Sequence, residues 1–158
     1  MDWWSFFFSF RGRINRAKYW LALLIFTIVG MVQGLVGLAL GNAVPFQIFH
    51  FLIDLAVFVA SIAVGIKRLH DRDRSAWWLL LFYLGPVVFA GAGGAIMWAG
   101  ASSVGMTEDW SLFPRLCLLG GFALGIWGLV EIGFLRGSAG YNRFGPNPLG
   151  KHQSRAWA

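Results

Sequence analysis

Four long apolar stretches dominate the pattern of hydrophobic and polar positions along the chain. They cover residues 19–41, 46–66, 77–100 and 112–135. A helix that crosses a membrane needs about 20 mostly apolar residues, rising about 1.5 Å each, to span roughly 30 Å of hydrocarbon. Because each stretch has that length, the pattern predicts an all-α membrane protein with four transmembrane helices.

Composition supports this prediction. Of the 158 residues, 58% are hydrophobic and 13% are charged, whereas an ordinary soluble domain has roughly 25% charged residues. A soluble domain of this size has too little interior to bury so much apolar surface. The composition therefore excludes a soluble secreted protein and a disordered tail. The single cysteine, Cys117, excludes an internal disulfide, and we interpret it as a packing residue.

Basic residues cluster on one side of the four stretches. Four Lys or Arg residues precede the first stretch, four lie between the second and third, and four follow the fourth, whereas Arg115 falls on the other side. Short loops rich in Lys and Arg stay in the cytoplasm, so we expect both termini there. A net charge of +6 would suggest nucleic acid in a soluble chain. Here we expect the lipid bilayer as the partner, and no nucleic acid.

The N-terminal segment differs from the four stretches in length and composition. Residues 3–10 are mostly aromatic and too few to cross a membrane, and they precede a basic run. Aromatic rings beside basic residues favour the headgroup zone, so we expect a short interfacial segment rather than a cleavable signal. We predict one four-helix membrane domain over residues 1–150 and a short polar tail over 151–158.

Regularly spaced glycines mark two of the predicted helices. The first carries Gly30, Gly34, Gly37 and Gly41, and the fourth carries Gly121, Gly125 and Gly128. Each set lies on one helical face, where small residues permit close contact between helices in lipid. We expect these two helices to pack on each other or on a second copy of the chain in a homo-oligomer. The alternative is that glycine is simply frequent in membrane helices.

Polar residues form a predicted layer inside the membrane. Asp54 lies roughly 12 Å from the outer end of the second stretch, His50 is one turn away, and Gln33 has a similar depth in the first stretch. Arg115 could reach this layer from the outer surface. The layer is either a small polar cavity that handles a proton, an ion or a polar group, or a hydrogen-bonded cluster that sets helix register. His50 and Asp54 offer two metal ligands where zinc needs three or four, so we expect no metal site.

Glu131 is an interfacial acid near the cytoplasmic end of the fourth stretch. Arg136, Lys67 and Arg68 should lie at the same interface. We therefore expect a salt bridge there rather than a catalytic role.

Three segments on the predicted cytoplasmic side combine arginine and aromatic residues. They cover residues 10–20, 67–78 and 137–148. Such combinations suit phosphate headgroups or cation–π stacking, while Asp71 and Asp73 offer internal partners for Arg11, Arg13 or Arg68. The residues that we assign to a cytoplasmic platform are Arg11, Arg13, Arg16, Arg68, His70, Asp71, Arg72, Trp77, Trp78, Asn142, Arg143 and Phe144.

Together these segments resemble the domain-of-unknown-function 805 family of small bacterial inner-membrane proteins. The family's opening F-x-G-R-x-x-R-x-x-Y-W, central R-R-L-H-D-x-x-x-S-G-W-W and closing G-x-x-G-x-N-x-F-G-x-x-P patterns all have counterparts here. Two departures are mild, because Lys67 replaces the first central Arg and Ala76 replaces the usual Gly. The resemblance implies a multi-pass protein of the bacterial inner (plasma) membrane and implies no particular activity.

The motif segments favour a non-enzymatic scaffold or adaptor whose platform binds anionic lipid or a protein partner. On this hypothesis Arg13→Ala or Arg68→Ala weakens binding to anionic liposomes, and raised salt has the same effect. One alternative is that the basic loops only set topology while the other residues tie the loops together. Another is an oligomeric small transporter, channel subunit or lipid-handling protein that uses the layer around Asp54.

A membrane enzyme is a further alternative, with His70 as acid or base and Asp71 nearby. The sequence offers no accompanying nucleophile or Gly-rich phosphate loop. We therefore expect no catalytic residue and no cofactor.

Overall fold

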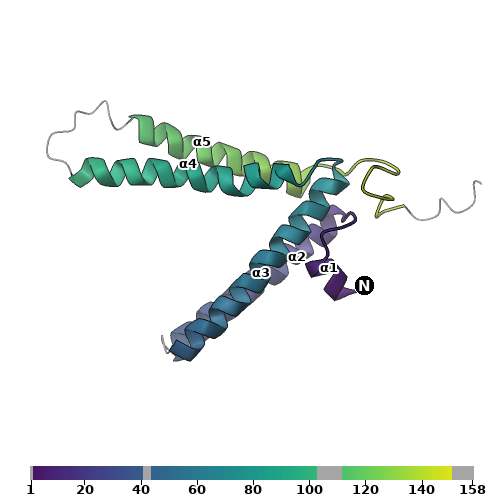
Figure 1. Cartoon of the computed structure of the whole chain (residues 1–158), viewed down its shortest axis with the longest axis horizontal. Coiled ribbons are helices and arrows are strands. Elements are labelled where there is room, and N and C mark those ends of the chain that lie inside the picture. Colours follow the sequence, from purple (N-terminus) through teal and green to yellow (C-terminus); the bar gives the residue numbers. More distant parts are fainter. Residues whose placement is uncertain (1, 41–43, 103–111, 151–158) are drawn as a thin grey trace, which may run out of the picture. The chain divides into compact units, whose positions relative to one another are not determined.

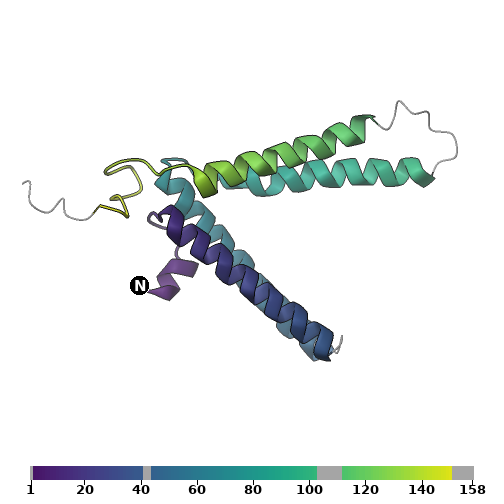
Figure 2. The same ribbon diagram turned by 180° about the vertical axis from the view of Figure 1, so that it is seen from behind.

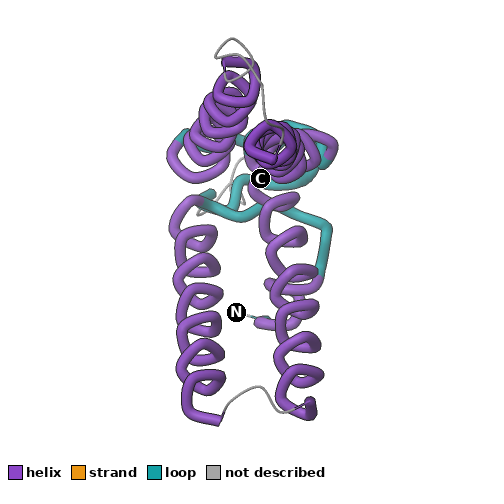
Figure 3. Tube along the Cα trace, turned by 90° about the vertical axis from the view of Figure 1, so that its left-hand side faces the viewer, coloured by secondary structure: helices purple, strands orange, loops and turns teal. Residues whose placement is uncertain are grey.

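The computed structural model describes residues 2–40, 44–102 and 112–150. These residues form helices and loops without a strand (Figure 3), apart from one isolated bridge between Asn142 and Gly145. The elements in chain order are α1 (Trp3–Phe8), α2 (Arg16–Leu40), α3 (Val44–Asp71), α4 (Trp77–Ser102), α5 (Leu112–Leu129) and a π-helix, η2 (Val130–Phe134). The all-α prediction is confirmed, whereas the predicted polar tail at 151–158 lies outside the described residues.

Four of the helices are long and apolar enough to cross a membrane, as predicted. Their most apolar windows have mean hydropathies between 1.8 and 2.3. The largest difference from the predicted bounds is at α3, which continues beyond residue 66 to Asp71. Its 28 residues correspond to a rise of about 42 Å, more than the hydrocarbon thickness. The last turn of α3 therefore extends past the hydrocarbon and carries the second motif with it.

The fourth predicted stretch is not a uniform α-helix. It begins as α5 and widens into η2, which closes with a 3.1 Å bond from the Leu135 N–H to the Val130 carbonyl. π-Helical turns place side chains in directions that an α-helix would not allow, and they are frequent at functional sites. Glu131 lies in this turn and is buried.

The chain divides into two compact units, residues 1–75 with 136–158 and residues 76–135. In the first unit α2 and α3 run side by side as an antiparallel hairpin, and α1 packs beside α3 (Figures 1 and 2). The hairpin follows from the very short connection between the two helices. A side-chain bond caps α1, because Asp2 Oδ1 accepts from the Trp4 N–H at 3.1 Å.

The second unit is the hairpin of α4 and α5, which contact each other along their length (Figures 1 and 2). A Cβ on Gly121 would lie 3.1 Å from the Pro86 carbonyl oxygen, and one on Gly128 would lie 3.0 Å from Phe82. The glycines of α5 therefore allow its backbone to approach α4 closely.

The α5 glycines thus pack against α4, a partner that the spacing of the glycines did not predict. The reason is that α4 offers its own small positions opposite them, such as Gly93, whose added Cβ would meet the Pro114 carbonyl oxygen at 2.8 Å. In α2 the space beside Gly30 and Gly34 is open. Gly41 lies outside the described residues, and the predicted homo-oligomer remains a prediction.

Candidate functional site

Asp71, the last residue of α3, is the centre of the site. Its Oδ1 accepts hydrogen bonds from Arg13 Nε at 3.1 Å and Nη2 at 3.0 Å, and its Oδ2 accepts from Arg68 Nη1 at 2.5 Å. The Arg13, Arg68 and Asp71 side chains are only 1%, 0% and 5% exposed. One buried carboxylate thus binds two buried guanidinium groups, an arrangement that is stable only when the remaining donors are also bonded.

Arg13 supplies those further bonds by reaching the third motif. Its Nη1 donates to the carbonyl oxygens of Gly140 at 2.9 Å and Gly145 at 3.1 Å, and its Nη2 donates to that of Ser138 at 2.8 Å. A guanidinium has five N–H donors in a fixed plane, which suits several acceptors at once. A single side chain of the first motif therefore holds the second and third motifs together.

The third motif also caps the end of α3. The Asp71 carbonyl accepts from the Ser138 N–H at 2.7 Å, and the His70 carbonyl accepts from Asn142 Nδ2 at 2.9 Å. These bonds satisfy two of the carbonyl groups that a helix leaves without intrahelical partners. Gly137 is required at this point, because a Cβ there would collide with the Asp71 carboxylate.

Aromatic stacking adds a second connection between these segments. The His70 and Phe144 rings are nearly parallel, at 5°, with centroids 3.8 Å apart, and Arg143 Cζ lies 4.8 Å from the Phe144 centroid. His70 Nδ1 is 3.3 Å from the Gly12 carbonyl oxygen. Gly12 has a φ of +90°, which L side chains rarely adopt, so a glycine is needed where the first motif turns toward His70.

Lys67 joins the aromatic helix α1 to α3. Its Nζ donates to the Ser5 carbonyl at 3.0 Å and the Phe6 carbonyl at 2.5 Å, and it lies 5.5 Å from the Phe6 ring centroid. The Lys67 carbonyl in turn accepts from the Ile14 N–H at 3.3 Å. A cation at the C-terminal carbonyls of α1 also complements the helix dipole.

These contacts separate the predicted platform into an interior and a surface. The inner group, which we call the motif core, consists of the enclosed side chains of Arg13, Arg68 and Asp71 and of the half-buried residues His70, Ser138, Asn142 and Phe144. The exposed cations around it, which we call the basic rim, are Arg11, Arg16, Arg136 and Arg143. Arg143 forms an exposed ion pair with Asp73 at 3.2 Å.

The remaining platform residues are arranged differently. Arg72 donates from Nη1 to the Arg136 carbonyl at 2.6 Å. Trp77 and Trp78 belong to α4 in the other compact unit, where Trp77 is 76% exposed and Trp78 lies against Phe82 and Trp127.

Burial corrects the expectation that Arg13 and Arg68 contact lipid headgroups. Their side chains are almost fully enclosed, and their donors point at Asp71 and backbone carbonyls. Throughout the described part of the chain, every buried side-chain nitrogen and oxygen has a hydrogen-bond partner. These two arginines hold the loops together.

The predicted intramembrane layer is formed in part. Gln33 Nε2 donates to Asp54 Oδ1 at 3.2 Å and to the His50 carbonyl at 3.4 Å, which links α2 to α3. Asp54 is otherwise exposed. Arg115 lies in the other unit, so its contact with this layer remains a prediction. Among the residues described, no three His, Cys, Asp or Glu side chains are grouped to hold a metal ion.

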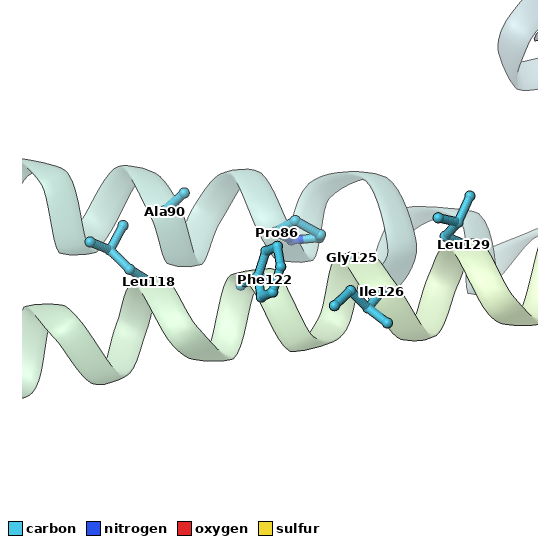
Figure 4. Close-up of a pocket in the computed structure, with 8 residues that line it drawn as sticks. Pro86, Ala90, Leu118, Phe122, Gly125, Ile126 and Leu129 are labelled. Atoms are coloured by element: carbon cyan, nitrogen blue, oxygen red, sulfur yellow. The ribbon is translucent and has the colours of Figure 1, made fainter.

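An apolar groove of about 470 Å³ lies along α4 and α5 (Figure 4). Its lining includes Pro86, Ala90, Leu118, Phe122 and Leu129. Because these side chains carry neither a charge nor a hydrogen-bonding group, the groove suits hydrocarbon and not a polar substrate.

Comparison with known proteins assigns this chain to a family. A family model described as "Protein of unknown function (DUF805)" matches residues 7–146. This range includes the first two motifs and all but the last two residues of the third. The chain belongs to the DUF805 family. The predicted resemblance is confirmed.

Three relatives from Escherichia coli (strain K12) are similar to this DUF805 protein. Inner membrane protein YhaI is 42% identical over 76 residues, which cover 48% of this chain and 63% of YhaI, less than two thirds of that relative. Inner membrane protein YhaH is 40% identical over 90 residues, 53% of this chain and 74% of YhaH. Uncharacterized protein YiiR is 30% identical over 138 residues, 87% of this chain and 84% of YiiR. No solved structure matches.

These relatives and the four long apolar helices establish that this DUF805 protein is an inner-membrane protein. The expected localisation is thereby confirmed.

Sequence reasoning missed the backbone groups that hold Arg13. The backbone carbonyls of Ser138, Gly140 and Gly145 accept its hydrogen bonds. Every residue has such a carbonyl, so the residue types do not indicate which ones act as acceptors. One signal was available, namely the glycines of the third motif. Gly140 and Gly145 have φ values of +73° and +128°, so they turn the chain and present neighbouring carbonyls to one point.

Proposed function

We propose that this DUF805 protein is a non-enzymatic scaffold of the inner membrane, whose basic rim binds anionic phospholipid headgroups on the cytoplasmic face. The observation that carries this proposal is the separation of charges in the first compact unit. The motif-core charges are buried and bonded to one another, whereas the rim cations Arg11, Arg16 and Arg136 are exposed.

The exposed cations provide the electrostatic attraction. Each Lys or Arg near an anionic leaflet contributes about 1 kcal/mol to binding, and the contribution falls off within a Debye length. The motif core holds the rim segments in one position through Arg13 and Asp71. Less conformational entropy is therefore lost when headgroups bind.

Helix α1 supports the placement of the rim at the headgroup level. Trp3 and Trp4 are 53% and 74% exposed, while Phe6 is buried and Lys67 holds the end of the helix. Indole rings concentrate at membrane–water interfaces because one edge is apolar and the other can donate a hydrogen bond.

The motif core also argues against catalysis by the two residues that the sequence suggested. Asp71 uses both carboxylate oxygens for arginine bonds, and His70 is stacked on Phe144 with Nδ1 facing the Gly12 carbonyl. A general acid or base must reach the proton that it transfers. Both carboxylate oxygens of Asp71 and the Nδ1 atom of His70 are engaged with the protein, which favours a scaffold over an enzyme.

Local lipid enrichment at the rim tests the proposal. A donor dye is attached to the cysteine of a Tyr141→Cys variant, because Tyr141 lies in the third motif and is 77% exposed. The free cysteine is removed by Cys117→Ser. The labelled protein is placed in nanodiscs that contain acceptor-labelled phosphatidylglycerol. Energy transfer reports the local concentration of the labelled lipid around the dye. Arg11→Gln should lower that local concentration by about fivefold, which corresponds to the loss of about 1 kcal/mol of attraction. Raising the salt to about 1 M, where the Debye length is about 3 Å, should do the same.

The matched control is Arg115→Gln, which removes one exposed cation from the other compact unit and should leave the transfer unchanged. Labelled phosphatidylcholine should respond to neither substitution. Equal transfer from the two lipids in the unmodified protein would refute the proposal.

A further inference from the structure

A cavity of about 350 Å³ opens beside the motif core and is lined by all three motifs. The first motif contributes Asn15 and Arg16, the second contributes Asp71, and the third contributes Gly137 and Asn147. Arg136, which lies two residues after η2, completes the polar lining.

We propose that this cavity is a binding site for one phosphate group, held by the guanidinium groups of Arg16 and Arg136. The inference rests on the proposed function for its location among lipid headgroups, and it adds a discrete site to the general attraction of the rim. The shared chemistry is a phosphate monoester or diester. Its source is either an anionic phospholipid headgroup or a soluble phosphate compound.

The charges around the cavity favour an anion despite the acid in its wall. Asp71 is bound on both oxygens by Arg13 and Arg68, so its negative charge is already balanced. The lining itself adds two more guanidinium groups, those of Arg16 and Arg136, to this neutralised carboxylate. Arginine is the side chain best suited to phosphate, because its planar N–H groups can bond two phosphate oxygens together.

The backbone on both sides of the cavity is held in place. Asn15 Oδ1 accepts from the Lys18 N–H at 2.9 Å, which caps α2 immediately before Arg16. On the opposite wall the Arg136 carbonyl accepts from Arg72 Nη1 at 2.6 Å. Both arginine side chains therefore project from ordered backbone.

The position of the cavity along the helices and its volume both fit a ligand of the size of a lipid headgroup. Arg16 is the first residue of α2, and Arg136 follows η2 by two residues, so both lie where apolar helices give way to polar sequence. Basic pockets at this level of cytoplasmic leaflets bind lipid headgroups. A volume of about 350 Å³ is near the lower end for ligand pockets, enough for a phosphate and its polar substituent but not for acyl chains.

The test uses the full chain purified in detergent and stripped of lipid. Native mass spectrometry with added phosphatidylglycerol should show one strongly retained lipid per chain. Arg16→Gln/Arg136→Gln should weaken this binding by at least about tenfold, because both charge-assisted contacts are lost. Arg11→Gln is the matched control, since Arg11 belongs to the rim but does not line the cavity, and it should retain the lipid.

A second variant leaves every charge in place. Ala139 lines the cavity and is exposed, so Ala139→Phe should obstruct the site without burying a polar group. The expected result is again loss of the retained lipid, with an unchanged unfolding temperature.

Competing probes identify the source of the phosphate. If inorganic phosphate or glycerol 3-phosphate displaces the lipid at millimolar concentration, the site is assigned to soluble phosphates, and if neither displaces it, the site is assigned to lipid. Equal binding by unmodified protein, the double variant and Ala139→Phe would overturn the inference. If that occurs while Arg11→Gln still lowers lipid enrichment at the rim, the cavity proposal fails and the scaffold proposal stands. Loss of both signals rejects both.

Discussion

The two compact units of this protein are stabilised by different interactions. In the α4–α5 hairpin, glycines such as Gly121 and Gly128 bring the helix backbones together along their length. In the α2–α3 hairpin, Gly30 and Gly34 face open space, and the strongest interactions gather at one end around Asp71. Close apolar packing therefore stabilises one unit, and a buried polar network at the end of the helices stabilises the other.

This difference has a physical origin in the surroundings of each contact. Inside the hydrocarbon, burial from water gives no driving force, so helices associate through close contact at small residues. Beyond the hydrocarbon, where the last turn of α3 extends, charged groups can be collected and bonded. The comparison predicts that the two units respond to opposite kinds of substitution.

The largest effect should come from removing the shared carboxylate of the motif core. Asp71→Ala leaves the guanidinium groups of Arg13 and Arg68 buried without a counter-charge, and it should cost about 3–5 kcal/mol of unfolding free energy. Denaturant titration in detergent measures this loss. The control is Asp73→Asn, which tolerates the local φ of +57° and removes an exposed ion pair with Arg143 that should contribute less than about 1 kcal/mol. Similar losses for the two variants would contradict the distinction between core and rim.

A smaller effect is expected from enlarging a packing glycine. Gly128→Leu should force Phe82 away from α5 and cost about 1–3 kcal/mol, because a Cβ alone would already lie 3.0 Å from that ring. The matched change Gly34→Leu meets open space and should leave stability nearly unchanged. Thermal unfolding of both variants tests this, and an equal loss at Gly34 would instead place a neighbour on that face of α2.

The smallest effect concerns the polar contact between α2 and α3. A double-mutant cycle with Gln33→Ala and Asp54→Ala should give a coupling of about 0.6 kcal/mol, the typical value for a hydrogen bond between membrane helices. Such a value supports the structural interpretation of this layer. A coupling near zero would show that this contact does not stabilise the hairpin, and it would favour the alternative that Asp54 serves transport.

Several features of the fold could be predicted from local sequence. The apolar runs specified four membrane helices, and the positions of Lys and Arg specified a basic end. The end of α3 was placed too early, at residue 66, because the charged residues that follow resemble a loop when taken alone. They continue the helix because Lys67 and Asp71 bind partners in other segments, and because Arg68 binds Asp71 within the last turn.

The glycine stripes show why packing partners were harder to predict. The stripes of α2 and α5 have matching spacing, yet Gly30 and Gly34 of α2 face open space, whereas Gly121 and Gly128 of α5 lie against α4. The spacing of glycines identifies the helix face that lacks side chains and that another helix can approach closely. The choice of partner depends on the opposing helix, where α4 offers Pro86 and Gly93 opposite α5.

The sequence by itself determined the membrane class, the helix number and the grouping of three motifs at one end, because these depend on residue type and on separations of a few residues. It could not assign the arginines, since Arg11, Arg13 and Arg16 stand within one short segment and look equivalent. Tertiary structure alone decided that Arg13 is buried while the other two are exposed. Its bonds reach Asp71, 58 positions away, and Ser138, 125 positions away, and contacts at such separations exist only once the segments have folded together.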